Sequence, residues 1–115
     1  EIAVLAGCAV VDLAALSLTE RPEERLHLLE YGLVASLVLE ALRERRRHAR
    51  LPAFTAAPAA VLVTGAAGWL DEAIQGALPN RVYELRDAGL NLAAALLAVL
   101  AILALGAARR ADRSR

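Results

Sequence analysis

Two uninterrupted apolar stretches restrict the fold of this chain more than any other feature of its sequence. Residues 51–70 and 88–108 carry no charged side chain. Each is close to the length of about twenty residues that an α-helix needs to cross a hydrocarbon core. Both are apolar on all sides, so neither has the polar, solvent-facing side of a helix in a soluble bundle. Because a chain of 115 residues is too small to bury two such helices in its own core, the sequence predicts membrane helices.

Two further apolar segments complete a predicted four-helix bundle. Residues 2–19 are apolar except for Asp12, which we expect to be protonated or hydrogen-bonded inside the bundle. Residues 26–42 carry their ionisable side chains near the ends, where water or the bundle interior is within reach. The chain is 58% hydrophobic, against about 45–50% for soluble domains. We expect an all-α fold, a single membrane domain over residues 1–115 with four transmembrane helices at about 2–19, 26–42, 51–72 and 88–108.

The arginines orient this bundle. Five lie in residues 43–50 and four in residues 109–115, whereas the other two links hold two each. Four spans place the two arginine-rich segments on one side, and the positive-inside rule makes that side the cytoplasm. All thirteen basic residues are Arg, which suggests a GC-rich bacterial coding sequence. The sequence therefore predicts a multi-pass protein of the bacterial plasma (inner) membrane with the N-terminus and C-terminus both cytoplasmic.

The basic run at residues 43–50 has two interpretations. It is either a binding site for anionic lipid or nucleic acid, or a topology determinant that rests against acidic head groups. We favour the second, because orientation alone requires such a run and the formal net charge is zero. Membrane lipids are therefore expected partners, and nucleic acid is not.

Polar side chains gather on the predicted extracytoplasmic side. Residues 24–31, 71–75 and 87–91 each repeat polar side chains at intervals of three and four, which places them on one helix face. Three such patches at adjacent helix ends form one candidate binding site. It comprises Glu24, His27, Glu30, Tyr31, Asp71, Glu72, Gln75, Arg81, Asp87 and Asn91.

Four motifs in this region resemble the VanZ-like family of small bacterial membrane proteins. They are Glu24-Arg25-Leu26-His27-Leu28-Leu29-Glu30-Tyr31-Gly32, Gly68-Trp69-Leu70-Asp71-Glu72-Ala73-Ile74-Gln75, Leu78-Pro79-Asn80-Arg81 and Arg86-Asp87-Ala88-Gly89-Leu90-Asn91. The resemblance covers about residues 20–100. Asn80 stands where the family usually has Gly, and residues 92–95 lack the Gly that often follows. The resemblance implies a role in the cell envelope, since the namesake is associated with resistance to the glycopeptide teicoplanin.

The polar residues can act as a site or as a structural lock. As a site, Arg81 or Arg86 would hold a phosphate or carboxylate of a cell-wall precursor or a glycopeptide, and His27 would titrate near neutral pH. As a lock, Arg81 would pair with Asp71 or Asp87 and fasten the helix ends together. The sequence favours the lock and leaves both open.

Catalysis is the less favoured alternative, and no catalytic residue is assigned. Only His27 is an outer imidazole, whereas catalytic zinc commonly needs two or three His, so neither a metal nor a cofactor is predicted. A carboxylate set would suit Mg²⁺ or Ca²⁺ as the metal alternative. That set is Glu24, Glu30, Asp71 and Glu72.

Helix packing suggests a further alternative, an accessory or structural subunit of a larger membrane complex. Small residues recur every four positions in the third helix and allow a neighbouring backbone to approach closely. They are Ala56, Ala60, Thr64 and Gly68. At the inner end of the second helix, we expect Glu40 to reach toward the arginine run. A lone His27 is expected to be a hydrogen-bonded histidine rather than a pigment or haem ligand.

Overall fold

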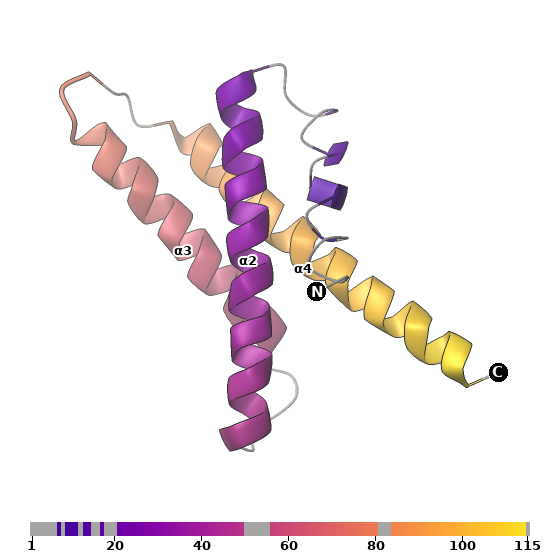
Figure 1. The fold of residues 1–115 in the computed structure, drawn as a ribbon. Coiled ribbons are helices and arrows are strands. Elements are labelled where there is room, and N and C mark those ends of the chain that lie inside the picture. Colours follow the sequence, from indigo (N-terminus) through magenta and orange to yellow (C-terminus); the bar gives the residue numbers. More distant parts are fainter. Residues whose placement is uncertain are drawn as a thin grey trace.

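Three long helices form the described part of the chain. The computed structural model describes residues 7, 9–11, 13, 14, 17, 21–49, 56–80 and 84–114. Its helices are α2 (Pro22–Ala49), α3 (Ala56–Gly76) and α4 (Leu85–Arg113), and each packs against the other two (Figure 1). Short turns aside, the described residues are helical and include no strand. The all-α prediction is therefore confirmed for this part of the chain.

Helix α2 is longer than the predicted segment 26–42 at both ends. Pro22 occupies its first turn, where the missing N–H costs no hydrogen bond. At the other end, Arg43 donates to Glu40 at 2.7 Å and Arg47 donates to Glu44 at 3.0 Å. Pairs at this spacing stabilise a helix, and basic residues in the last turn suit its dipole. The arginine run thus continues the helix, and the expected reach of Glu40 toward Arg43 is confirmed.

Helix α3 buries one stripe of small residues. Its buried positions recur every four residues and extend the predicted stripe by one turn. They are Ala56, Ala60, Thr64, Gly68 and Glu72. The helix runs four residues past the predicted end at 72, and turn hydrogen bonds to the carbonyls of Ile74 and Gln75 follow. Residues 77–80 form a turn, whereas residues 51–55 of the predicted helix lie outside the described residues.

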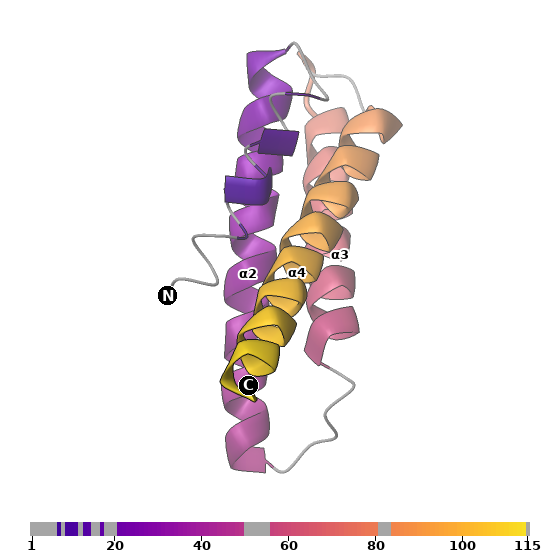
Figure 2. The same cartoon turned by 90° about the vertical axis from the view of Figure 1, so that its right-hand side faces the viewer.

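Helix α4 crosses the other two at an inclined angle (Figure 2). It begins three residues before the predicted 88 and ends five after the predicted 108. Glu84 precedes it in extended conformation without a side-chain cap, and Asp87 supplies negative charge in the first turn. Its buried face is small and mostly apolar. That face consists of Ala88, Asn91, Ala94, Ala95, Ala98, Val99 and Ile102.

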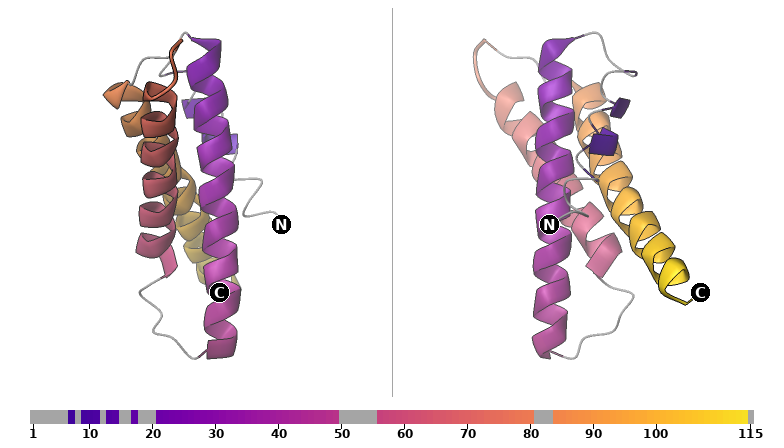
Figure 3. Two further views of the ribbon diagram at one scale, coloured as in Figure 1. Left: turned by 90° about the vertical axis from the view of Figure 1, so that its left-hand side faces the viewer. Right: turned by 45° about the vertical axis from the view of Figure 1, so that its right-hand side comes forward.

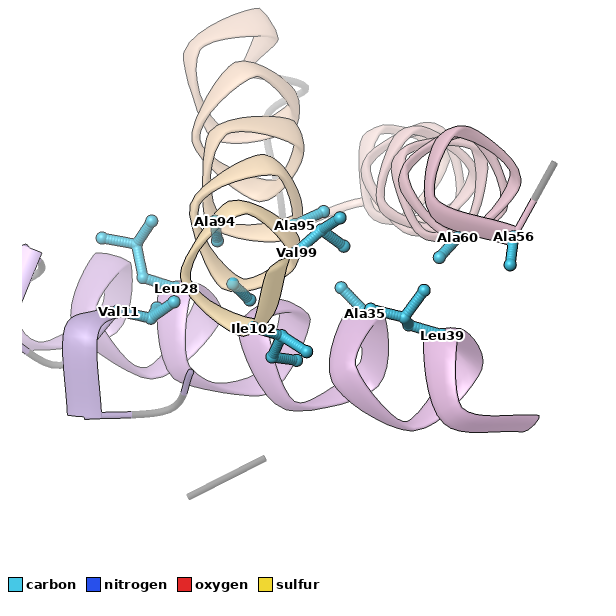
Figure 4. Close-up of a cluster of buried hydrophobic side chains, with 11 residues drawn as sticks. Val11, Leu28, Ala35, Leu39, Ala56, Ala60, Ala94, Ala95, Val99 and Ile102 are labelled. Carbon is cyan, nitrogen blue, oxygen red and sulfur yellow. The ribbon is translucent and has the colours of Figure 1, made fainter. Parts of the chain in front are cut away.

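The interior is built from small side chains and polar ones. Alanines from all three helices fill it together with a few larger residues, among them Val11, Leu28 and Ile102 (Figure 4). Large apolar side chains lie on the outside instead, as Leu13, at 70% exposure, illustrates. The buried polar side chains are Glu24, Ser36, Thr64, Glu72 and Asn91. This distribution is the reverse of the usual one, in which large apolar residues are inside and charged ones outside.

The two ends of the bundle differ in chemistry. The first turns of α2 and α4 and the last turn of α3 lie together at one end (Figures 1 and 3). The opposite end carries the arginines of the last turns of α2 and α4. The arginines of these last turns and the predicted polar site are therefore separated by the length of the helices.

Among the described residues, α4 alone is long and apolar enough to cross a membrane. In its most apolar stretch 39% of the residues are buried within the structure, so most face outward. Helix α2 has Glu30 and Glu40 along its length, and α3 ends on Asp71 and Glu72. Most of predicted helix 2–19, including Asp12, lies outside the described residues.

Replacing Gly68 with alanine should destabilise the bundle. A Cβ built there would lie 2.8 Å from the Cβ of Asn91 and 3.2 Å from Cε1 of Tyr31, so α3 would have to move away from α4. We expect Gly68→Ala to lower the free energy of unfolding in detergent micelles by about 1–3 kcal/mol, the usual cost of overpacking. In the matched control Gly89→Ala, a Cβ meets nothing within 4 Å, and the better helix former should leave stability equal or higher. Equal stability of both variants would contradict this account.

Candidate functional site

Side chains from three helix ends form a polar cluster at the end of the bundle opposite the basic last turns of α2 and α4. Helix α2 contributes its first turns, α3 its last turns and α4 its first turns (Figure 1). Chain segments far apart in sequence thus meet. We define the polar cluster as Glu24, His27, Tyr31, Asp71, Glu72, Gln75, Arg86, Asp87 and Asn91.

His27, Asp71 and Glu72 lie at its centre. One imidazole nitrogen and one carboxylate oxygen from each acid all lie within 4.8 Å of one another. Glu72 is 2% exposed, while the other two are half-buried. Two acids and an imidazole this close together can bind a cation between them.

Tyr31 fixes two of these groups. Its ring stacks on the His27 ring, with centroids 6.3 Å apart and planes at 8°. Its hydroxyl donates a hydrogen bond to the Asp71 carboxylate. Asp71 Oδ2 also accepts from Gln75 Nε2 at 2.9 Å. Both contacts hold the Asp71 carboxylate in one orientation, and the first joins α2 to α3.

An ion pair joins α2 to α4. Arg86 Nη1 lies 2.9 Å from Glu24 Oε1, and Arg21 Nε lies 3.8 Å from the same oxygen. Glu24 is 4% exposed whereas Arg86 is 57% exposed, so a solvated guanidinium covers a buried carboxylate. Arg86 therefore binds a carboxylate of the protein itself. The lock hypothesis expects such a pair, although it named Arg81 as the arginine.

Several buried polar atoms of this region have no hydrogen-bond partner within the described part of the chain. Glu72 accepts a hydrogen bond from the backbone N–H of Glu84, yet its Oε1 has none. The other such atoms are both carboxylate oxygens of Glu24, His27 Nδ1, Thr64 Oγ1, Asp87 Oδ1, and Oδ1 and Nδ2 of Asn91. Each buried unpaired polar group costs about 1–3 kcal/mol. Of these side chains, Glu24 is covered by its ion pair with Arg86.

Most of the predicted site residues meet as expected, with two exceptions. Eight of the ten belong to the polar cluster. Glu30 is exposed, because it lies about 100° around the helix from Tyr31 and faces away. Arg81 lies outside the described residues. His27 Nδ1 is buried without a hydrogen-bond partner among the described residues, so the expectation of a hydrogen-bonded His27 stays a prediction.

Two contributions to the site escaped the sequence prediction. The pairing of Arg86 with Glu24 joins residues of different helices, and spacing within one helix cannot reveal it. Thr64 and Gly68 were noted as packing positions, but Thr64 adds a buried hydroxyl and Gly68 lets both Asn91 and Tyr31 approach α3 closely. The four-residue spacing of small side chains in α3 was the sequence signal that could have indicated the roles of Thr64 and Gly68.

No protein-family model, no curated protein and no solved structure matches this chain. The resemblance to the VanZ-like family therefore rests on the four motifs. The chemistry of the site rests on the geometry of its side chains.

Removing Arg86 should weaken the attachment of α2 to α4. In Arg86→Gln the buried Glu24 carboxylate loses its cation, and we expect a loss of about 1–3 kcal/mol in the free energy of unfolding. Arg110→Gln is the matched control, since Arg110 is exposed in the same helix, and it should change stability by less than about 0.5 kcal/mol. In a double-mutant cycle, the combination with Glu24→Gln should cost less than the sum of the two single changes. Additive costs would show that the two side chains do not interact.

Proposed function

We propose that this chain is a small multi-pass protein of the bacterial plasma membrane, of VanZ-like type, whose polar cluster binds a cell-envelope ligand at the extracytoplasmic face. One observation carries the proposal: the bundle buries polar side chains, three of them at the end opposite its basic last turns, and exposes many of its large apolar ones.

The exposed apolar surface supports a lipid environment. Leu62, Trp69 and Leu70 of α3 are all more than half exposed, as are Leu85 and Leu100 of α4. Soluble monomers rarely expose contiguous apolar surface of this extent. Lipid tails would cover it at no cost, while small residues let the helices approach one another.

The direction of the acidic side chains supports spans by α2 and α3 as well. Charges count against insertion when they face lipid, and less when they face the bundle interior or lie near an end. Glu24 and Glu72 are buried between the helices, and Glu40 pairs with Arg43 toward the basic end. Their charges therefore weigh less against spanning than their number suggests.

The arginines support the orientation. The last turns of α2 and α4 carry basic residues at the end opposite the polar cluster. By the positive-inside rule that end would face the cytoplasm. The polar cluster would then face the extracytoplasmic side, where cell-wall precursors and glycopeptides are found.

The cluster divides between the two roles that the sequence left open. The pair of Arg86 with Glu24 and the contacts of Tyr31 with Asp71 act as a lock. Unpaired oxygens of Glu72 and Asp87 instead suit a ligand that brings hydrogen-bond donors or positive charge. Amino and amide groups of a cell-wall precursor or a glycopeptide meet that requirement.

The role of an accessory subunit in a larger complex is the weaker candidate. Its support was the small-residue stripe of α3, and that stripe is buried against this chain's own helices. What remains for another membrane subunit is the exposed apolar surface, which lipid covers equally well. A stable partner that co-purifies from native membranes would favour this role.

Cysteine labelling tests the orientation. In a Cys8→Ala background, we expect Asn80→Cys, in the exposed turn after α3, to react with a membrane-impermeant maleimide in intact spheroplasts. Ser114→Cys, beyond the other end of α4, should react only after the membrane is opened. Recovery of the chain without detergent, or the reverse labelling pattern, would refute the proposed topology.

Teicoplanin susceptibility tests the envelope role. Expression of the chain in a susceptible bacterium should raise the minimal inhibitory concentration of teicoplanin. His27→Ala and Arg81→Ala should abolish the increase, while His48→Ala, an exposed position at the other end of α2, should keep it. If the first two variants insert normally and still confer resistance, the polar cluster does not bind the ligand.

A further inference from the structure

We propose that His27, Asp71 and Glu72 bind a divalent transition-metal cation, Zn²⁺ or Mn²⁺, in the centre of the polar cluster. This inference concerns the site itself and holds whichever envelope ligand, if any, the protein binds. It runs against the sequence-based expectation of no metal, which rested on the single outer histidine.

The separation of the three side chains fits one ion. Their nearest ligand atoms all lie within 4.8 Å of one another. Ligands about 2.0–2.2 Å from a tetrahedral zinc lie about 3.3–3.6 Å apart. Movements of about an ångström, within the freedom of side-chain torsions, would bring the three atoms to the same ion.

Burial supplies a second, independent reason for a ligand here. Glu72 is 2% exposed, and its Oε1 has no hydrogen-bond partner among the described residues although it lies in this group. Asp87 is a like-charged neighbour of Glu72, and its buried Oδ1 is also without a described partner. Two carboxylates thus lie beside the imidazole and a third lies near Glu72, and a divalent cation would offset their mutual repulsion and satisfy the buried oxygens.

The surroundings hold the ligands in place. Asp71 accepts hydrogen bonds from Tyr31 and Gln75, and the Tyr31 ring lies against the His27 ring. Outer partners of this kind orient metal ligands and strengthen binding. Ligands on α2 and α3 would also make the metal a clamp between two helices.

The donor set selects the metal. Mg²⁺ and Ca²⁺ take oxygen ligands, whereas imidazole suits zinc and other transition metals and carboxylate suits manganese. One imidazole with two carboxylates therefore favours Zn²⁺ or Mn²⁺ over the hard cations. Three protein ligands also leave a coordination position for an oxygen of a bound ligand.

Metal analysis of the full chain in detergent tests the proposal. The protein is stripped with a chelator, equilibrated separately with ZnCl₂ and MnCl₂, and studied by mass-spectrometric metal analysis and calorimetry. We expect one Zn²⁺ or Mn²⁺ per chain, not displaced by excess Mg²⁺ or Ca²⁺. Because loss of an outer partner alone weakens metal binding by about 10–100-fold, His27→Gln and Glu72→Gln should each weaken it by more than about 100-fold.

The chain provides its own matched control. His48 and Glu44 also form a histidine–glutamate pair, at 3.1 Å, but both are exposed at the basic end of α2. His48→Gln and Glu44→Gln should leave the affinity unchanged. Co²⁺ bound to the native chain should show visible absorption bands that His27→Gln removes, which reports ligation even if Glu72→Gln fails to fold.

Three results would overturn the metal site. They are absence of stoichiometric Zn²⁺ and Mn²⁺ from the native chain, retention of affinity in His27→Gln, and binding of Mg²⁺ or Ca²⁺ alone. The first would be expected if Arg81 neutralises the carboxylates instead. None of them bears on the topology, which the cysteine labelling decides separately.

Discussion

Close approach of α3 to its neighbours is the constraint on which the rest of the structure depends. Gly68 has no side chain at the point where Asn91 of α4 and Tyr31 of α2 meet it. One turn later, the same stripe carries Glu72 into the interior. The spacing that packs the helices thus also delivers the buried acid of the candidate site, so packing and chemistry share one helix face.

This arrangement explains how so apolar a chain keeps charged groups inside. An interior of alanines leaves little apolar area to bury, and the hydrophobic effect alone gives weak cohesion. Hydrogen bonds and ion pairs between helices then carry more of the specificity, as in helix bundles within lipid. Glu24 with Arg86 and Tyr31 with Asp71 have this role, and each joins a different pair of helices.

Much of the fold could be predicted from the periodicity of the sequence. The rest depends on contacts between side chains that periodicity does not reveal. Apolar blocks located α3 and α4, and four-residue spacing identified the buried stripe. Helix ends were misplaced because a hydropathy pattern ends a helix at the first run of charged residues. Ion pairs within the helix, such as Arg47 with Glu44, instead extend it. That the chain crosses the membrane four times stays a prediction, since among the described helices only α4 satisfies length and apolarity together.

Prediction of the site succeeded within each helix and failed between helices. Spacing correctly grouped His27 with Tyr31, and Asp71 with Gln75. It also placed Glu30 in the site, because a neighbour in sequence can lie on another face of the helix.

Which acids act as a lock and which as a site depends on the partners that other helices provide. Arg86 reaches Glu24 across the interface, and Tyr31 reaches Asp71. Among the described residues, no side chain donates a hydrogen bond to Glu72 Oε1 or Asp87 Oδ1. A protein that needed only a lock would gain stability from apolar residues at these two positions, because buried acids without partners are costly. Glu72 lies beside His27, and under the proposed function a bound ligand would satisfy both carboxylates.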